Sequence, residues 1–515
     1  MTSFKGRESP RLLLVQAYDP ESLLGHLLGD LRGYREHLLE KFPEQEVWLP
    51  KEPFDREPPW PEGRRVKAGP SATARNVAGH FLAANLAVPT RVVDEPVTPQ
   101  VLARELESGG YTHVGFSVYV NGYSDFLRCA RFLKREYPHL VVLAGNAGAL
   151  FPETDHHVDA VCLGHGVPFL RRLFGQPEDD PYRLEMIDTS STLRLAGGRV
   201  RLPRATIVTK VGCPVGCDFC VTHRLYGGKW FGPFFTPAEV HEALVRHREE
   251  VGRDFQTWVA EPLGLANGAW WRELFSLFEG EAGDYPVWVS ATASILERFD
   301  LDAARNSAMR LEVVNVGVES LSRGYSKNRG VDVGRLVGRL ADHGVGSWLT
   351  YIVGFDHHDR EGALAEVEVL AGFDALVTDV ANLMALPGTE VWRRLEREGR
   401  LLAGIPRDFF FTAGFQAFRH PHFRPGFVDV VPLLVEAAEV VERERGVAGL
   451  NFLPLIRNLS NPSPAARAMA QLLEWHAKKA FPRWVEAFSP TPAQIAKYGR
   501  KLGGEGKVGV EFKSA

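Results

Sequence analysis

The sequence predicts an α/β protein with two successive parallel sheets and a mostly helical C-terminal part. Apolar, strand-like runs alternate with helix-period segments between residues 72 and 175, and the same alternation returns between residues 204 and 400. The alternation stops after residue 400, where only helical periodicity remains. A chain of 515 residues with 45% hydrophobic content is long enough to build the cores of two or three domains.

Residues 1–175 are predicted to form a Rossmann-like, doubly wound domain. Its strand-like runs are 11–18, 91–94, 113–120, 140–144 and 160–163. Residues 50–70 are rich in proline and charge, which indicates an exposed connection. Ligands of such sheets bind at the carboxyl ends of the strands, where glycines let a large ligand approach the backbone. A linker over residues 176–203 carries a hairpin signal at Gly197-Gly198.

Residues 204–400 contain six further strand-like runs, each followed by a helical segment. These runs are 205–209, 255–260, 287–291, 311–318, 347–353 and 375–383. Six such units predict a barrel or partial barrel with its active groups at the carboxyl ends of the strands. Residues 401–515 are predicted to form a helical cap, with helices at 430–444, 464–480 and 492–501.

Three of the five cysteines, Cys213, Cys217 and Cys220, form a C-x3-C-x2-C array within a loop broken by glycine and proline. Three thiolates on one short loop suit a soft metal centre, and they leave one coordination position open for chemistry. Two other interpretations stay open. His223 would complete a Cys3His zinc knot, and the cysteines could instead be buried free thiols.

Phe219, directly before the last cysteine, completes the pattern C-x3-C-x-aromatic-C. With this motif and the strand ends that follow it, residues 204–400 resemble the radical S-adenosylmethionine (radical SAM) enzymes. The resemblance implies that Cys213, Cys217 and Cys220 hold three irons of a [4Fe–4S] cluster. The fourth iron would bind S-adenosylmethionine (SAM), and an electron from an external donor such as flavodoxin or ferredoxin would release a 5′-deoxyadenosyl radical.

The resemblance also implies a set of SAM contacts. Glu261 ends the second strand and would face the SAM ammonium, although the usual glycines before it are missing. The expected contacts are Phe219, Glu261, Ser290, Thr292, Glu319 and Gly354. Ser290 and Thr292 would bind the carboxylate or ribose, Glu319 would position the ligand, and Gly354 would admit the adenine. For a lone polar residue the alternative is a capping or turn role. His357-His358 could be a metal pair, although a solvated turn is favoured.

The first domain is similar to the cobalamin-binding domain of one radical SAM subgroup. The similarity rests on Val114-Gly115-Phe116-Ser117, on Ala144-Gly145-Asn146 and on the run from Asp159 to Gly166. The implied cobalamin contacts are Ser117, Tyr119, Gly145, Asn146, Gly148, Gly164 and Gly166. The D-x-H-x-x-G signature is missing after the first strand, so no lower axial ligand is assigned. A retained domain without cofactor is the alternative.

The resemblance therefore implies a cobalamin-dependent methyltransferase that acts on an unactivated carbon of a small molecule, with no further catalytic residue assigned. A radical rearrangement or cyclisation enzyme, which uses cobalamin differently or not at all, is one alternative. A zinc-structured binding protein is a more distant one. The net charge of −4, with interspersed lysines and arginines, predicts no nucleic-acid surface. The sequence contains no apolar run long enough to predict a membrane span. The few cysteines and the lack of a signal-peptide core predict a cytoplasmic location.

Overall fold

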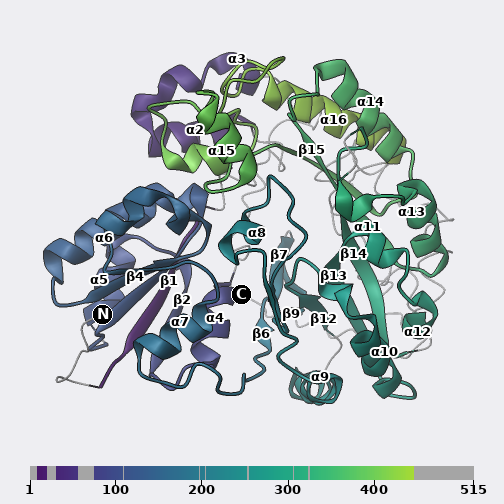
Figure 1. The fold of residues 1–515 in the computed structure, drawn as a ribbon, viewed down its shortest axis with the longest axis horizontal. Coiled ribbons are helices and arrows are strands. Elements are labelled where there is room, and N and C mark those ends of the chain that lie inside the picture. The colour runs from purple at the N-terminus through teal and green to yellow at the C-terminus, as the bar shows by residue number, and fades with distance from the viewer. Residues whose placement is uncertain are drawn as a thin grey trace.

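The computed structural model has the predicted α/β architecture of two parallel sheets with helices packed on them (Figure 1). It describes residues 9–19, 31–55, 75–107, 109–195, 198–202, 204–251, 255–305, 307–322 and 325–445. The helices predicted at 464–480 and 492–501 lie outside the described residues.

The first sheet has five parallel strands in the order β2-β1-β3-β4-β5. They are β1 (Leu12–Ala17), β2 (Thr90–Pro96), β3 (His113–Val118), β4 (Val141–Gly145) and β5 (Ala160–Cys162). The helices with them are α4 (Val77–Ala84), α5 (Pro99–Glu107), α6 (Tyr123–Glu136) and α7 (Gly166–Leu173). Leu13 and Val15 pack into one core and Leu12 and Leu14 into another, because helices cover both faces of β1. Each predicted strand of this domain is confirmed.

The second sheet contains the six predicted parallel strands in the order β16-β15-β14-β13-β12-β9. They are β9 (Arg204–Ile207), β12 (Gln256–Val259), β13 (Tyr285–Ala291), β14 (Met309–Glu319), β15 (Gly346–Val353) and β16 (Val377–Asn382). A short strand, β6 (Ile187–Asp188), pairs antiparallel with β9 at the edge. The sequence did not predict β6, because two residues are too few for a periodic pattern.

Helices line the outer side of this sheet, as Figure 1 shows. They are α9 (Pro237–Val251), α10 (Gly268–Leu277), α11 (Ala293–Leu296), α12 (Leu301–Arg305), α13 (Val333–Asp342) and α14 (Arg360–Ala371). The helical segment predicted between the third and fourth strands is two short helices, α11 and α12. Outward-facing side chains of β15 such as Leu349 and Tyr351 are fully buried beneath the helices, whereas inward-facing Trp348 and Thr350 keep partial exposure. The inner face of the barrel sheet is thus not filled by the packing that closes a complete barrel.

The N-terminal residues 31–55 form α2 (Leu31–Lys41), the 3-10 helix η1 (Pro43–Trp48) and α3 (Lys51–Asp55), which the sequence analysis missed. These helices lie beside α15 (Glu390–Arg397) and α16 (Val430–Arg445) at the top of Figure 1. The Tyr34 hydroxyl donates to the Ala413 carbonyl at 2.8 Å, and Phe54 is completely buried. Residues 51–55 are therefore helical rather than a plain connection, and the expected exposure is wrong for Phe54, whereas Lys51 and Glu52 are exposed.

A buried charge cluster joins the N-terminal helices to the rest of the chain. Lys41 Nζ lies 2.8 Å from Asp19, 2.9 Å from Asp125 and 3.3 Å from Asp408. Asp408 belongs to the 3-10 helix η8 (Arg407–Phe411), which brings the C-terminal segment onto the first domain. Burial raises the pKa of Asp408 to about 6, and the negative charge of Asp125 acts in the same direction, whereas Lys41 and Ser124 oppose the rise.

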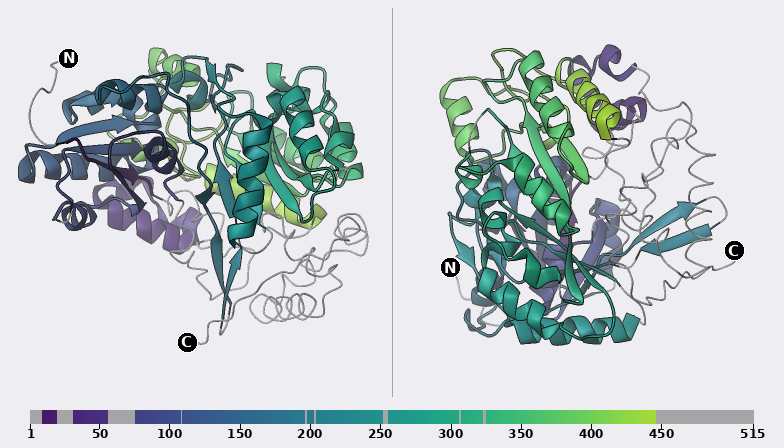
Figure 2. Two further views of the ribbon diagram at one scale, coloured as in Figure 1. Left: turned by 90° about the horizontal axis from the view of Figure 1, so that it is seen from below. Right: turned by 90° about the vertical axis from the view of Figure 1, so that its right-hand side faces the viewer.

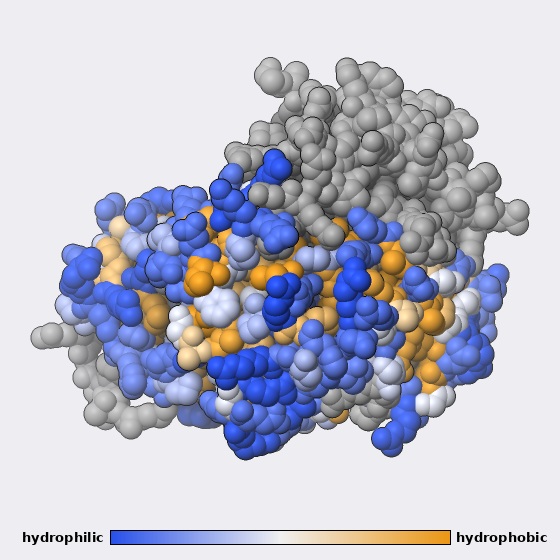
Figure 3. Space-filling view, turned by 90° about the horizontal axis from the view of Figure 1, so that it is seen from above, coloured by the Kyte–Doolittle hydropathy of each residue, from blue (hydrophilic) through white to orange (hydrophobic). Residues whose placement is uncertain are grey.

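The predicted hairpin is present as β7 (Ser191–Leu195) and β8 (Gly198–Leu202), and it projects from the body of the molecule (Figure 2). Polar residues dominate the face drawn in Figure 3, with apolar residues in a band across it. Among the described residues, no helix combines the length and apolar character that a membrane crossing needs.

Candidate active site

The three cysteines of the array lie in a loop between β10 (Val211–Gly212) and α8 (Val221–Leu225), which is the strand–loop–helix setting that the sequence predicts. β10 pairs with β11 (Trp230–Phe231) and so closes the base of the loop. Gly212 and Gly216 have φ angles of +89° and +77°, a conformation that favours glycine. The backbone therefore turns sharply on both sides of Cys213.

The three thiols lie within electrostatic range of one another. Burial raises the pKa of Cys217 to about 11, and the charges of Lys327, Cys220, Glu319 and Cys213 also act on this thiol. One zinc ion would need its sulfur ligands about 3.8 Å apart, given Zn–S bonds of about 2.3 Å and tetrahedral geometry. In the described part of the chain, the one trio of possible ligand atoms within 4.8 Å of one another contains no cysteine. The three cysteine sulfurs are therefore not all within 4.8 Å of one another. Such a spacing suits a cluster, in which each cysteine binds a different iron.

His223, the fourth ligand in the zinc interpretation, supports the loop instead. Its Nδ1 lies 3.2 Å from the Cys213 carbonyl oxygen, to which it donates. The ring also packs against Gly228, where a Cβ atom would come within 2.8 Å of the imidazole Cε1. These contacts give His223 a structural role that explains its place three residues after Cys220.

Glu319 is held beside the cysteine loop in a strained conformation. Its φ angle is +66°, and the only other non-glycine residue with positive φ among the described residues is Asn146. The Glu319 carboxylate forms an ion pair with Lys327, the same lysine whose charge acts on Cys213 and Cys217. Such strain persists where the surroundings impose it, and it is concentrated at functional sites.

Phe219 packs the cysteine loop against the ends of the neighbouring strands. Its ring meets Tyr325 edge-on at 5.5 Å and Phe355 at 6.1 Å, and Lys327 Nζ lies 6.0 Å from its centroid. The aromatic side chain of the motif thus fixes the loop next to the Glu319–Lys327 pair.

Glu261 is buried at the end of β12 and is already bound by its own chain. Its Oε1 accepts hydrogen bonds from the Thr209 N–H at 2.6 Å, the Thr209 hydroxyl at 2.5 Å and the Lys210 N–H at 3.0 Å. Lys210 Nζ lies 3.3 Å from Oε2. Burial raises the pKa of Glu261 and lowers that of Lys210. Contact between Glu261 and a SAM ammonium stays a prediction.

The other predicted SAM residues lie at successive strand ends. Ser290 is on the inner face of β13, and the Thr292 hydroxyl caps α11 by accepting from the Ile295 N–H at 3.2 Å. Gly354 follows β15 with φ +92°, and a Cβ there would lie 3.5 Å from Gln416 Oε1. Thr292 therefore has the capping role that was the alternative to contact with SAM. Its contact with SAM stays a prediction.

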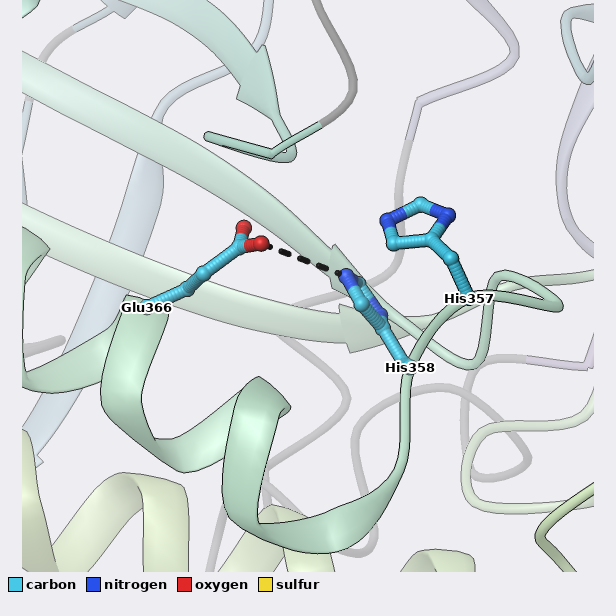
Figure 4. A group of neighbouring side chains, drawn as sticks. All are labelled: His357, His358 and Glu366. Atoms are coloured by element: carbon cyan, nitrogen blue, oxygen red, sulfur yellow. Dashed lines mark ion pairs between the residues drawn. The ribbon is translucent and has the colours of Figure 1, made fainter.

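Figure 4 shows that His357, His358 and Glu366 lie together near the end of β15. His358 is 1% exposed, so the expected solvated turn is wrong for this residue. Glu366 accepts hydrogen bonds from the Leu321 N–H at 2.6 Å, the Ser322 N–H at 3.1 Å and the Ser320 hydroxyl at 3.2 Å. Burial alone would raise the pKa of Glu366, but interaction with His358 and the hydrogen bonds from Ser322 and Leu321 hold it low, and the carboxylate anchors the loop that follows Glu319.

Three of the predicted cobalamin residues meet at the carboxyl edge of the first sheet. Ser117 and Gly145 are register neighbours on β3 and β4. Asn146 has φ +75°, and its Nδ2 donates to the Ser117 hydroxyl at 3.1 Å. Burial raises the pKa of Tyr119, and the neighbouring Asn146 acts on it in the opposite direction. A second strained residue thus marks the second predicted site.

The carboxyl edge of the first sheet faces the cysteine loop across α8, which Figure 1 places between the two domains. Burial raises the pKa of Tyr226, at the end of α8, to about 12, and the charges of Cys162 and Tyr119 also act on it. Gly164 approaches α8, since a Cβ there would lie 3.8 Å from the Leu225 carbonyl. The two predicted cofactor sites are therefore adjacent.

Two predicted cobalamin glycines have packing reasons of their own. A Cβ at Gly148 would come within 2.5 Å of Val118, and one at Gly166 within 2.9 Å of Leu82. Their contact with cobalamin stays a prediction.

No protein-family model matches the chain, and no curated protein matches it. Solved structures do. The radical SAM methyltransferase TsrM from Kitasatospora setae, with cobalamin and a [4Fe–4S] cluster bound, matches with a TM-score of 0.52 and 15% identity, over 92% of this chain and 99% of that one. The cobalamin-dependent SAM radical enzyme OxsB, with aqua-cobalamin bound, matches with a TM-score of 0.53 and 14% identity, over 96% of this chain and 79% of that one.

The chain has the fold of the cobalamin-dependent radical SAM enzymes. The match extends over both sheets, so it confirms the predicted succession of a Rossmann-like domain and a radical SAM partial barrel.

Sequence reasoning missed several residues around this radical SAM-type barrel. Lys327 reaches the cysteine loop from a segment without periodicity, so its sequence position carries no signal. Gln416, from the C-terminal segment, is completely buried, and in the described part of the chain its amide atoms have no partner. A polar residue between the apolar Phe415 and Ala417 was the available hint.

Proposed function

We propose that this chain is a radical SAM enzyme whose Cys213, Cys217 and Cys220 bind a [4Fe–4S] cluster. The observation that carries the proposal is the arrangement of these cysteines, which share one loop at the carboxyl end of a parallel sheet, act on one another electrostatically, and do not all lie within 4.8 Å of one another. The donor set also fits. Burial raises the pKa of Cys213 and Cys217, so a bound cationic centre is what would hold them as thiolates.

SAM would lie beside the cluster, at the ends of β13, β14 and β15. Glu319 supports this position, because its strained backbone aims a carboxylate toward the cysteine loop while Lys327 fixes the side chain. Glu366 holds the following loop in place through backbone N–H groups, which keeps Glu319 where a ligand would meet it. The protein contributes orientation here, since the cofactors carry the reactive chemistry.

Cobalamin would occupy the carboxyl edge of the first sheet. Ser117, Tyr119 and Asn146 would hold it there, close to Tyr226 and the cysteine loop. When bound, the cluster with SAM supplies abstraction of a hydrogen atom, and cobalamin supplies a transferable methyl group. The facing edges of the two domains would bring both groups to one substrate, and this supports methyl transfer to an unactivated carbon. TsrM, a methyltransferase, and OxsB share this fold.

The test is formation of 5′-deoxyadenosine by anaerobically reconstituted protein with a reductant such as reduced flavodoxin. Cys217→Ala should abolish it. Cys129→Ala is the matched control, because Cys129 is a buried thiol in the first domain with no place in the loop. Wild-type turnover in the Cys217 variant would refute the cluster assignment.

Corrinoid content after anaerobic purification tests the cobalamin part. Methyl transfer predicts about one corrinoid per chain and transfer of a labelled methyl group from SAM to product. A protein that makes 5′-deoxyadenosine but retains no corrinoid would contradict cobalamin-dependent methyl transfer and favour a rearrangement or cyclisation.

A further inference from the structure

The inner face of the barrel sheet divides into a lower part, whose carboxylate is paired with a cation and with polar side chains, and an upper part, whose carboxylate has no cationic partner among the described residues. In the lower part, Glu312 accepts from the Gln256 amide at 2.6 Å and from the Trp288 indole N–H at 3.0 Å. Arg310 lies 3.6 Å from the same carboxylate. The charged groups of the lower part therefore already have partners within the protein.

The upper part begins one layer nearer the carboxyl ends of the strands. Asn315 pairs in register with Trp348, and Thr350 pairs with Asp379, so all four side chains project from the same face. They keep partial exposure, in contrast to the buried outer face. Among the described residues, neither the Asn315 amide nor the Thr350 hydroxyl has a hydrogen-bond partner.

Asp379 is the acidic group of this upper part. Burial raises the pKa of its carboxyl, and no lysine, arginine or histidine of the described chain lies within ion-pair distance. A carboxylate that has little access to water and no counter-ion is costly, and a cation relieves that cost most directly. The Trp348 ring, held edge-on to Trp288 at 6.1 Å, adds an aromatic surface that attracts cations.

We propose that the upper inner face binds the substrate of this enzyme, and that the substrate carries a protonated nitrogen which pairs with Asp379 beside Trp348. This inference rests on the proposed function, because the upper inner face lies directly below Glu319 and Gly354, where SAM would sit. Asn315 and Thr350 offer hydrogen bonds to neighbouring polar atoms of the substrate. The aromatic and carboxylate groups together select an amine or guanidine on an apolar body and disfavour anions.

The test compares two probes that differ in one group, phenethylamine and 2-phenylethanol, by calorimetric titration of the anaerobically reconstituted full chain with SAM present. The ammonium probe should bind at least tenfold more tightly than the alcohol. Asp379→Asn should reduce this preference to within about twofold, whereas Glu361→Gln, on the exposed side of α14, should retain it. Trp348→Phe should weaken binding of the ammonium more than binding of the alcohol.

Equal affinity for the two probes, absence of binding, or a preference that survives in Asp379→Asn would overturn the inference. Iron content and 5′-deoxyadenosine formation are measured on the same preparations. Protein that fails those two assays refutes the proposed function, and protein that passes them while showing no ammonium preference refutes only this substrate class.

Discussion

Replacement of Gly212 by alanine tests how the backbone builds the cysteine loop. Gly212 has φ +89°, which costs an alanine about 1–2 kcal/mol. In addition, the new Cβ would lie 2.3 Å from the Lys229 carbonyl oxygen, a rigid backbone atom. Relief of that overlap must separate β10 from β11, where Val211 pairs with Phe231 and Gly212 with Trp230. Loss of two backbone hydrogen bonds adds about 1 kcal/mol each, for a total of about 3–4 kcal/mol.

Gly227 provides a matched control, since it has φ +60° but a Cβ added there would meet no atom of the described residues within 4 Å. Gly227→Ala should cost only the backbone strain, about 1–2 kcal/mol. Both variants are measured by urea unfolding and by iron bound after anaerobic reconstitution. Gly212→Ala should lose most of its iron, and Gly227→Ala should keep it. Equal stability and iron content in the two variants would refute the idea that β10–β11 pairing shapes the loop.

Two further changes probe the ligand-positioning acid and the buried charge cluster. Glu319→Gln removes the charged partner of Lys327, so the Kd for SAM should rise about 10-fold, which corresponds to about 1.4 kcal/mol. The iron content should stay unchanged. A wild-type affinity for SAM in calorimetry would contradict this role. Asp408 has a folded-state pKa of about 6, above its unfolded value of 3.8, so the native state binds more protons between those values. The unfolding free energy of wild type relative to Asp408→Asn should therefore fall by on the order of 2 kcal/mol as pH rises from about 4 to about 6, and a flat difference in denaturant titrations would refute the assignment.

The regular elements of both sheets were predictable because their signals are local. β1, with its run Leu12–Val15, and β14, with its Val-rich run, read as buried strands from their own residues. β6 is too short for a pattern. The helix α2 was missed because its burial depends on Phe409 and Phe427, almost 400 residues away, rather than on a strong apolar stripe of its own.

The residues of the candidate site also fall into those that the sequence could predict and those that it could not. The cysteine array and Glu319 could be found because motif spacing and strand ends mark them in the sequence. Lys327 and Asp379 could not be found, since their importance comes from which groups surround them in space. Glu261 illustrates the converse, because its position at a strand end was predictable but its hydrogen bonds to Thr209 and Lys210 were not.

The central claim is that one loop of this chain carries an iron–sulfur cube on three thiolates. Quantification of iron, acid-labile sulfide and zinc in anaerobically reconstituted wild-type protein tests it most directly. We predict about four irons and four sulfides per chain, with Cys213→Ala, Cys217→Ala and Cys220→Ala each losing most of both. One zinc per chain, or wild-type iron content in any of the three variants, would contradict the account.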